Sequence, residues 1–137
     1  MKISYILLFS TLMVFSVSGC AYQEVLNRQM MEFESTIPTC NSEEECKIKW
    51  AAAQQWILSV YQWDFLRVAD DFIEAYAYDP RYRYRIADVR VVKWSMGKNK
   101  YRMIIYIYGD PHPFIKYPVW DEWEKKIDFN RYVNSAY

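Results

Sequence analysis

The stretch from Asn41 to Val60, NSEEECKIKWAAAQQWILSV, predicts the element on which the rest of the fold is built. Ser42 and Glu45 match the capping box that opens a helix, where a serine hydroxyl and a glutamate carboxylate accept backbone amides of the first turn. Glutamates in that turn also suit the positive end of the helix dipole. Apolar side chains then recur at the spacing of one helix face, at Cys46, Trp50, Ala53, Ile57 and Val60. We therefore predict a helix over residues 43–60.

Four strand-like segments follow this helix. They cover residues 63–69, 72–78, 84–95 and 101–108, and they are separated by Asp70-Asp71, Asp79-Pro80 and Met96-Gly97-Lys98-Asn99, which are turn signals. Connections this short cannot carry parallel crossovers, so the segments predict an antiparallel meander. Beyond Pro118, residues 119–134 predict a second helix with a broad apolar arc formed by Val119, Trp123, Ile127, Phe129 and Val133.

This order of elements predicts an α+β fold, in which both helices pack on one face of a four-stranded antiparallel meander. Small residues let the two layers approach closely, and we expect this role for Ala51, Ala53, Ala75 and Ala87. The residues expected inside are Trp50, Ile57, Trp123 and Ile127 of the helices with Val89 and Val91 of the sheet. The opposite face should carry tyrosines and charges, and a partner surface is expected there.

The first twenty residues have the order of a secretory signal. Lys2 precedes an apolar run from Ile3 to Val17, and Ser18 and Gly19 stand before Cys20. Val17-Ser18-Gly19-Cys20 resembles the lipobox of bacterial lipoproteins. The resemblance implies cleavage before Cys20, a diacylglycerol thioether on its sulfur and a fatty acyl chain such as palmitate on its amino group. A retained transmembrane helix is disfavoured because the run is shorter than the roughly 20 residues that a bilayer core requires.

These features divide the chain into a signal peptide over residues 1–19, a lipidated start and tether over 20–39, and a single domain over 40–137. A helical turn is expected at residues 24–31, and the sequence leaves open whether the tether is ordered. Ala21 stands where an aspartate often marks retention in the inner membrane of Gram-negative bacteria. The resemblance therefore implies the cell outer membrane, with the domain facing the periplasm.

Cys40 and Cys46 are the two cysteines left after Cys20 is assigned to lipid. In an exported chain such a pair most simply forms a disulfide. With Ser42 as N-cap, the two cysteines lie near the positions of a hydrophobic staple, so a bond there would fix how the chain enters the helix. The glutamates between them oppose thiolate formation, which disfavours a redox role, and two cysteines alone make a poor zinc site.

Several short motifs are shared with a wider group of proteins. The chain resembles a group of small uncharacterised bacterial envelope lipoproteins through Cys40, Glu45-Cys46, Lys49–Ala53, Trp56, Phe72–Tyr76 and Phe129–Val133. The resemblance covers most of the chain after the signal. It implies the anchor and the disulfide, and it brings no catalytic activity.

No reactive centre is evident in the sequence. A serine nucleophile needs a histidine partner, and the single histidine, His112, lies between prolines without a Gly-x-Ser-x-Gly elbow. Asp110 and His112 lack a third metal ligand, and Gly97 and Gly109 stand alone, so no phosphate-binding loop is formed. Seventeen cations balance seventeen anions, which gives no global field for nucleic acid. We expect no enzymatic activity and no cofactor.

Arginine alternates with tyrosine in Arg81-Tyr82-Arg83-Tyr84-Arg85. If this stretch is extended, Arg81, Arg83 and Arg85 share one face and form a candidate anion-binding site. The structural alternative is an edge strand whose charges prevent aggregation. We expect a membrane-anchored lipoprotein with a non-enzymatic structural or protein-interaction role. The alternative is a binding module for an anionic envelope glycan or lipid headgroup, through these arginines.

Overall fold

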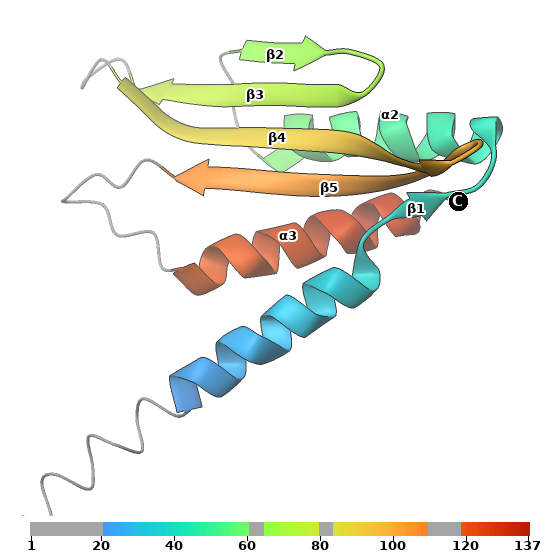
Figure 1. Ribbon diagram of the computed structural model, residues 1–137. Helices are drawn as coiled ribbons and strands as arrows, with labels where there is room; N and C mark the ends of the chain where they lie inside the picture. Colours follow the sequence, from blue (N-terminus) through green and yellow to red (C-terminus); the bar gives the residue numbers. More distant parts are fainter. Residues whose placement is uncertain (1–20, 61–64, 80–83, 110–118) are drawn as a thin grey trace, which may run out of the picture.

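A computed structural model describes residues 21–60, 65–79, 84–109 and 119–137 (Figure 1). A helix over residues 21–36 comes first and carries no label in the figure. The labelled elements follow in the order β1 (Thr39–Cys40), α2 (Glu43–Val60), β2 (Phe65–Val68), β3 (Phe72–Asp79), β4 (Tyr84–Gly97), β5 (Lys100–Gly109) and α3 (Val119–Asn134). Both predicted helices therefore have their predicted bounds.

The strands form one antiparallel sheet in the order β1-β5-β4-β3-β2. The predicted α+β class is confirmed, and β2 to β5 follow one another as the predicted meander. The prediction of four strands and two helices is incomplete, because the described residues also contain β1 and the helix over 21–36. With two residues, β1 is too short to show an alternating pattern, and it pairs with β5, some sixty residues later in the chain.

Alternation along the strands separates two faces of the sheet. The register aligns Ile73, Val91 and Ile105 across β3, β4 and β5. These odd-numbered positions are buried, together with Ala75, Val89 and Met103. They pack against α2 and α3 in a single core, and Figure 1 shows α2 crossing behind the sheet. The expected placement of both helices on one face is therefore confirmed.

Trp56 joins the two helices at the centre of this core. Its ring meets the ring of Phe129 edge to face at 5.3 Å, and its indole N–H donates to the Asp128 carboxylate at 2.8 Å. Of the residues expected inside, Trp50, Ile57, Ile127, Val89 and Val91 are buried. Trp123 is only half-buried.

Two of the alanines expected between helix and sheet are buried as predicted, namely Ala53 and Ala75. The expectation for Ala51 is wrong, because Ala51 is exposed and Ala52 is buried in its place. One residue advances the helix by about 100°, which turns Ala51 towards solvent. The side chain of Ala87 lies outside the described residues.

Within the tether predicted over residues 20–39, the described residues 21–39 are ordered. A helix extends over residues 21–36 instead of one turn at 24–31. Phe33 and Ile37 belong to the hydrophobic core, and the Pro38 carbonyl accepts the Met103 amide at 2.9 Å. The sequence pattern missed this packing because the partners of residues 33–40 lie in β5 and α3, far along the chain.

Two tryptophans in this fold provide a matched test of the core. Trp50 is 9% exposed and packs in the core, whereas Trp94 is 55% exposed on β4. Trp50→Ala is expected to lower the free energy of unfolding by about 3–5 kcal/mol, measured by chemical denaturation. Trp94→Ala is expected to change it by less than about 0.5 kcal/mol. Equal losses for the two variants would contradict this assignment of the core.

Candidate functional site

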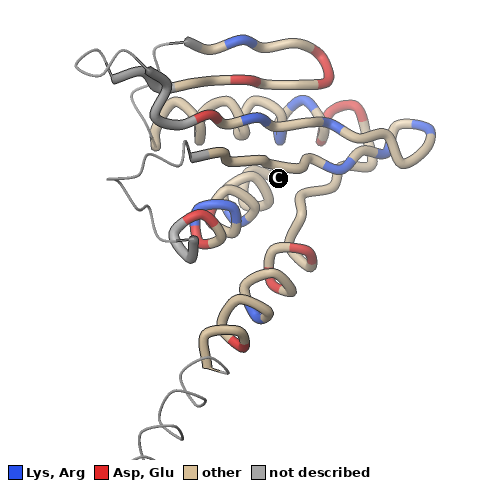
Figure 2. The backbone as a smooth tube through the Cα atoms, turned by 60° about the vertical axis from the view of Figure 1, so that its left-hand side comes forward, with Lys and Arg blue, Asp and Glu red and all other residues tan. Residues whose placement is uncertain are grey.

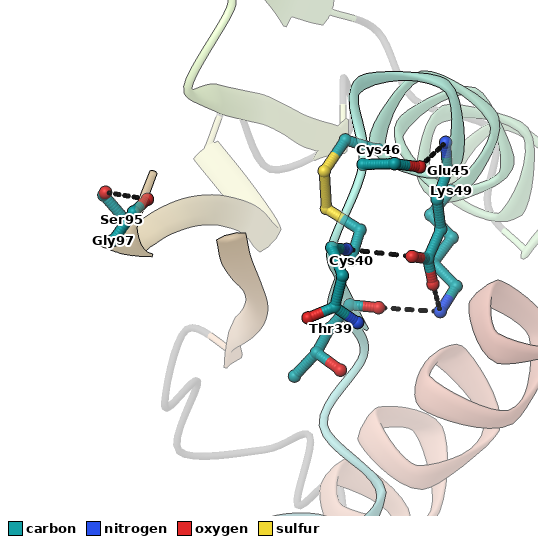
Figure 3. The surroundings of a disulfide bond; sticks show 9 residues. Thr39, Cys40, Glu45, Cys46, Lys49, Ser95 and Gly97 are labelled. Carbon is teal, nitrogen blue, oxygen red and sulfur yellow. Dashed lines mark hydrogen bonds and ion pairs between the residues drawn. A yellow bond between two sulfur atoms is a disulfide. The ribbon is translucent and has the colours of Figure 1, made fainter. Parts of the chain in front are cut away.

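The start of α2 is closed by a disulfide and a capping network (Figure 3). Cys40 and Cys46 are bonded, with their Cα atoms 5.1 Å apart, which confirms the predicted pair. The Ser42 hydroxyl accepts the Glu45 amide at 3.1 Å. The Glu45 carboxylate accepts the Asn41 amide at 2.8 Å, one residue before the position of an ordinary capping box. In the chain-entropy model so short a disulfide loop stabilises the fold by about 2 kcal/mol.

Lys49 adds a buried charge to this network. Its ammonium donates to the Thr39 carbonyl at 2.7 Å and to the Glu45 carboxylate at 2.8 Å. The side chains of this ion pair are only 10% and 13% exposed. A buried cation requires such partners, since removing one leaves an uncompensated charge. Lys49 therefore ties β1 to the first turns of α2 and makes this corner structural.

The helix over residues 21–36 is held on the domain by α3. The carbonyls of its last turn lack the backbone amide partners of the helix interior. The Thr36 hydroxyl donates to the Phe33 carbonyl, and two asparagines of α3 add further donors. The Asn130 amide donates to the Phe33 carbonyl at 3.1 Å and the Asn134 amide to the Thr36 carbonyl at 2.8 Å. An ion pair joins Glu32 to Arg131. These contacts lie at the end of the helix that is farther from Cys20.

The other half of this helix projects away from the strands (Figure 1). Tyr22 and Val25 are about half exposed, and Leu26 is partly buried. In a helix these three residues share one side with Phe33. Phe33 packs edge to face on Trp123 at 5.6 Å. The apolar side of the helix is thus covered at its docked end and exposed at Tyr22 and Val25.

The open sheet face consists of the even-numbered positions of β3, β4 and β5. None of its described members is buried, in contrast to the odd-numbered positions. They are Phe72, Glu74, Tyr76, Asp88, Arg90, Val92, Trp94, Arg102, Ile104, Tyr106 and Tyr108. The expected mixture of tyrosines and charges is therefore confirmed, and among the described elements both α2 and α3 lie on the other side.

Contacts between neighbouring strands organise the open sheet face. Glu74 pairs in register with Arg67 on one side and Arg90 on the other, and its carboxylate contacts the Arg90 guanidinium at 2.5 Å. This contact raises the pKa of Arg90. The rings of Tyr106 and Tyr108 lie parallel, 6.4 Å apart. Aromatic and arginine side chains of this kind are enriched at protein interfaces.

The structure brings the predicted site residues together only at the disulfide. Cys20, Arg81, Arg83 and His112 lie outside the described residues. Arg85 lies in β4, where its backbone pairs with Tyr78, and its side chain is also not described. The candidate anion-binding site therefore stays a prediction.

Two important residues escaped the sequence analysis. Lys49 occupies the apolar face of its helix, three residues after Cys46 and four after Glu45, and this placement is a readable signal for a paired buried cation. Asn130 is fully buried, but its partners lie in the helix over 21–36, so no local pattern indicates its role.

Comparisons with known proteins add no family assignment. No protein-family model matches the chain, and no curated protein matches it. Within the described ranges, no cluster of three or more histidine, cysteine, aspartate or glutamate side chains could hold a metal ion. None of the helices in the same part of the chain is long and apolar enough to cross a membrane.

The network around Glu45 makes stability depend on pH. Hydrogen bonds from Lys49 and from the Asn41 amide lower the pKa of Glu45 below its usual 4.5. The folded state therefore binds fewer protons than the unfolded chain, and this stabilisation is lost as the pH falls below about 4.5. Glu45→Gln is expected to be less stable than the unmodified protein at neutral pH. The difference in the free energy of unfolding between the two should decrease on acidification to about pH 3.

Denaturation midpoints measured across this range provide the check. Glu44→Gln removes a carboxylate from the same turn and is the control. The stability difference between Glu44→Gln and the unmodified protein should not shrink on acidification as it does for Glu45→Gln, because Glu45 and Lys49 remain in contact in this variant. A gap for Glu45→Gln that stays constant with pH would contradict the role of this pair.

Proposed function

We propose that this chain is a lipid-anchored protein of the bacterial cell envelope with a non-enzymatic role. Its domain presents the open sheet face to another envelope protein. The single observation that carries the proposal is the Val17-Ser18-Gly19-Cys20 motif after an apolar run. Ala21 favours the outer membrane, with the domain in the periplasm.

The first helix supports this arrangement. Its described part, residues 21–36, follows the proposed lipidation site in the sequence and has a length of about 24 Å. Tyr22 and Val25 leave apolar surface exposed in its first turns, where a lipid-modified Cys20 would place the interface between headgroups and water. Tyrosine suits that interface because it combines an apolar ring with a polar tip.

The contacts of the helix with α3 make it a stiff spacer. Asn130, Asn134 and Arg131 hold its last turns. The domain then stands off the bilayer at one distance and attitude, which a flexible tether would not provide. A fixed attitude favours a structural or docking role, since it presents the same surface to every partner.

The open sheet face is the proposed docking surface. It combines aromatic side chains, arginines and the aliphatic pair Val92 and Ile104, and it runs across three neighbouring strands. The alternative function is binding of an anionic glycan or headgroup through Arg81, Arg83 and Arg85. Capture of such a ligand without protein would favour that alternative.

The anchor is tested by Cys20→Ser. We expect this variant to leave the membrane fraction and the detergent phase on temperature-induced phase separation, because it has no sulfur to carry diacylglycerol. Ser10→Ala keeps the Val17–Cys20 motif and should partition like the unmodified protein. Unchanged partitioning of Cys20→Ser would refute the lipid anchor.

The docking surface is tested by photo-crosslinking in cells. A photoreactive residue replaces either Tyr108, which is 56% exposed on the open sheet face, or Leu58, which is 57% exposed on α2. The two sites have matched exposure, and they lie on opposite sides of the sheet. We expect discrete protein adducts from position 108 and none from position 58. The same adducts from both positions would argue against the open sheet face.

A further inference from the structure

The end of the β4–β5 hairpin forms a second distinctive surface, which we call the hairpin tip (residues 93–102). Its sequence, KWSMGKNKYR, contains four cations and no acidic residue. The cations are Lys93, Lys98, Lys100 and Arg102, and Figure 2 shows basic positions gathered towards this end of the two strands. Trp94 and Met96 are more than half exposed beside them. An exposed indole next to a cluster of cations makes this surface a candidate binding site.

The backbone of the hairpin tip displays these side chains outward. Gly97 pairs with Lys100, and Lys98 and Asn99 form the turn between them. Asn99 has a φ of 59°, a left-handed conformation that asparagine tolerates better than most residues. A Cβ atom placed on Gly97 would meet nothing within 4 Å. The turn is therefore open to solvent on that side.

Two cations have fixed positions on opposite faces of the hairpin. Arg102 pairs in register with Trp94 on the open sheet face. Lys93 lies on the core face, with its ammonium 4.9 Å from the centre of the Trp50 ring and 5.4 Å from that of Tyr101. Such cation–π contacts hold the charge in place without neutralising it. The hairpin tip is therefore positive on both faces and at the turn.

Acidic groups nearby offset part of this charge. Glu43, Glu44 and Glu45 open α2 just after β1, which pairs with Tyr101 and Arg102, although Glu43 and Glu45 form ion pairs with Lys47 and Lys49. Glu34 lies 3.6 Å from Arg102, and its side chain is 68% exposed, so the pair contributes little. The Asp71 carbonyl accepts the Lys93 amide at 2.7 Å, which brings the exposed Asp71 close to Lys93. Lys98 and Lys100 lie beyond Glu34 and Asp71, at the end of the hairpin. Both lysines are exposed there and accessible to an approaching anion.

The hairpin tip points away from the start of the first helix. In Figures 1 and 2 the two lie at opposite ends of the molecule. If Cys20 carries the lipid, as proposed above, the tip faces away from the anchoring bilayer. The headgroups of that bilayer are then out of its reach, and a ligand must come from the space beyond the domain.

We propose that the hairpin tip binds an anionic glycan, a polymer of sugar rings that carry carboxylate or phosphate groups. The lysine ammonium groups supply mobile point charges, and the Arg102 guanidinium supplies a planar pair of donors. The exposed indole of Trp94 packs against the C–H face of a sugar ring. This site is separate from the Arg81–Arg85 stretch and does not depend on a protein partner.

Alginate, a linear polyuronate, is the probe, and inorganic polyphosphate provides charge without sugar rings. Binding is measured with the full-length protein in a non-ionic detergent. Lys98→Gln with Lys100→Gln is expected to weaken alginate binding about tenfold. Arg28→Gln with Lys47→Gln removes two cations from exposed helical ion pairs and should leave the affinity unchanged. Trp94→Ala should weaken alginate binding several-fold and leave polyphosphate binding as it was.

Three results would overturn the proposal. The first is equal loss of alginate affinity in both charge variants, which would indicate a general effect of net charge. The second is no effect of Trp94→Ala on alginate, which would indicate an anion site that does not recognise sugar. The third is binding to phosphatidylglycerol in mixed micelles with the same detergent but not to alginate, which would make the ligand a lipid headgroup. Because the assay is done in detergent, it is independent of whether Cys20 carries lipid.

Discussion

The contact of Trp56 with α3 is the interaction on which the rest of this structure depends. The odd-numbered face of the sheet is entirely apolar at Ile73, Val91 and Ile105 and must be covered. One helix is too narrow to cover this face, so α2 and α3, which lie near opposite ends of the chain, cover it together. Trp56 packs between the two helices, and its indole N–H donates a hydrogen bond to the Asp128 carboxylate at the edge of the core. A large ring that also satisfies its polar atom can join two helices in this way.

The packing of α3 on α2 has consequences for the first helix. Once α3 is in place, its last turns present Asn130 and Asn134 to the carbonyls at the end of the helix over residues 21–36. Phe33 of this helix is itself a member of the core, so the first helix and α3 are held together by both apolar packing and hydrogen bonds. In turn, the exposed apolar start of this helix is held away from the sheet, which leaves the open sheet face uncovered by any described helix.

The sequence predicted those parts of the fold whose signals are local. The bounds of α2 and α3 follow from capping residues and apolar periodicity, and the Cys40–Cys46 bond follows from its spacing around Ser42. The fifth strand and the docked first helix could not be predicted, because their partners are distant in the sequence. The role of Lys49 as a buried, paired cation could have been inferred from its position on the apolar face of α2. The role of Asn130 could not, because its partners are distant in the sequence. For the candidate site, the open sheet face was predicted from strand alternation, but the hairpin tip was overlooked because its four cations are divided between β4, the turn and β5.

The two surfaces differ in a way that follows from their backbone. The open sheet face is a hydrogen-bonded array of three strands, in which Glu74 and Arg90 form an ion pair and the rings of Tyr106 and Tyr108 are stacked. Such a surface gains little from new ion pairs and suits a partner that covers area. At the hairpin tip Lys98 and Lys100 lie in and beside the turn and are exposed, so they suit the extended polymer proposed above, which offers many equivalent charges. Because Trp94 and Arg102 belong to both surfaces, a bulky protein seated far enough along β4 and β5 would compete with a glycan at the tip. If both proposals hold, docking and glycan binding are coupled through Trp94 and Arg102, whereas Tyr106 and Tyr108, farther along β5, belong to the proposed docking surface alone.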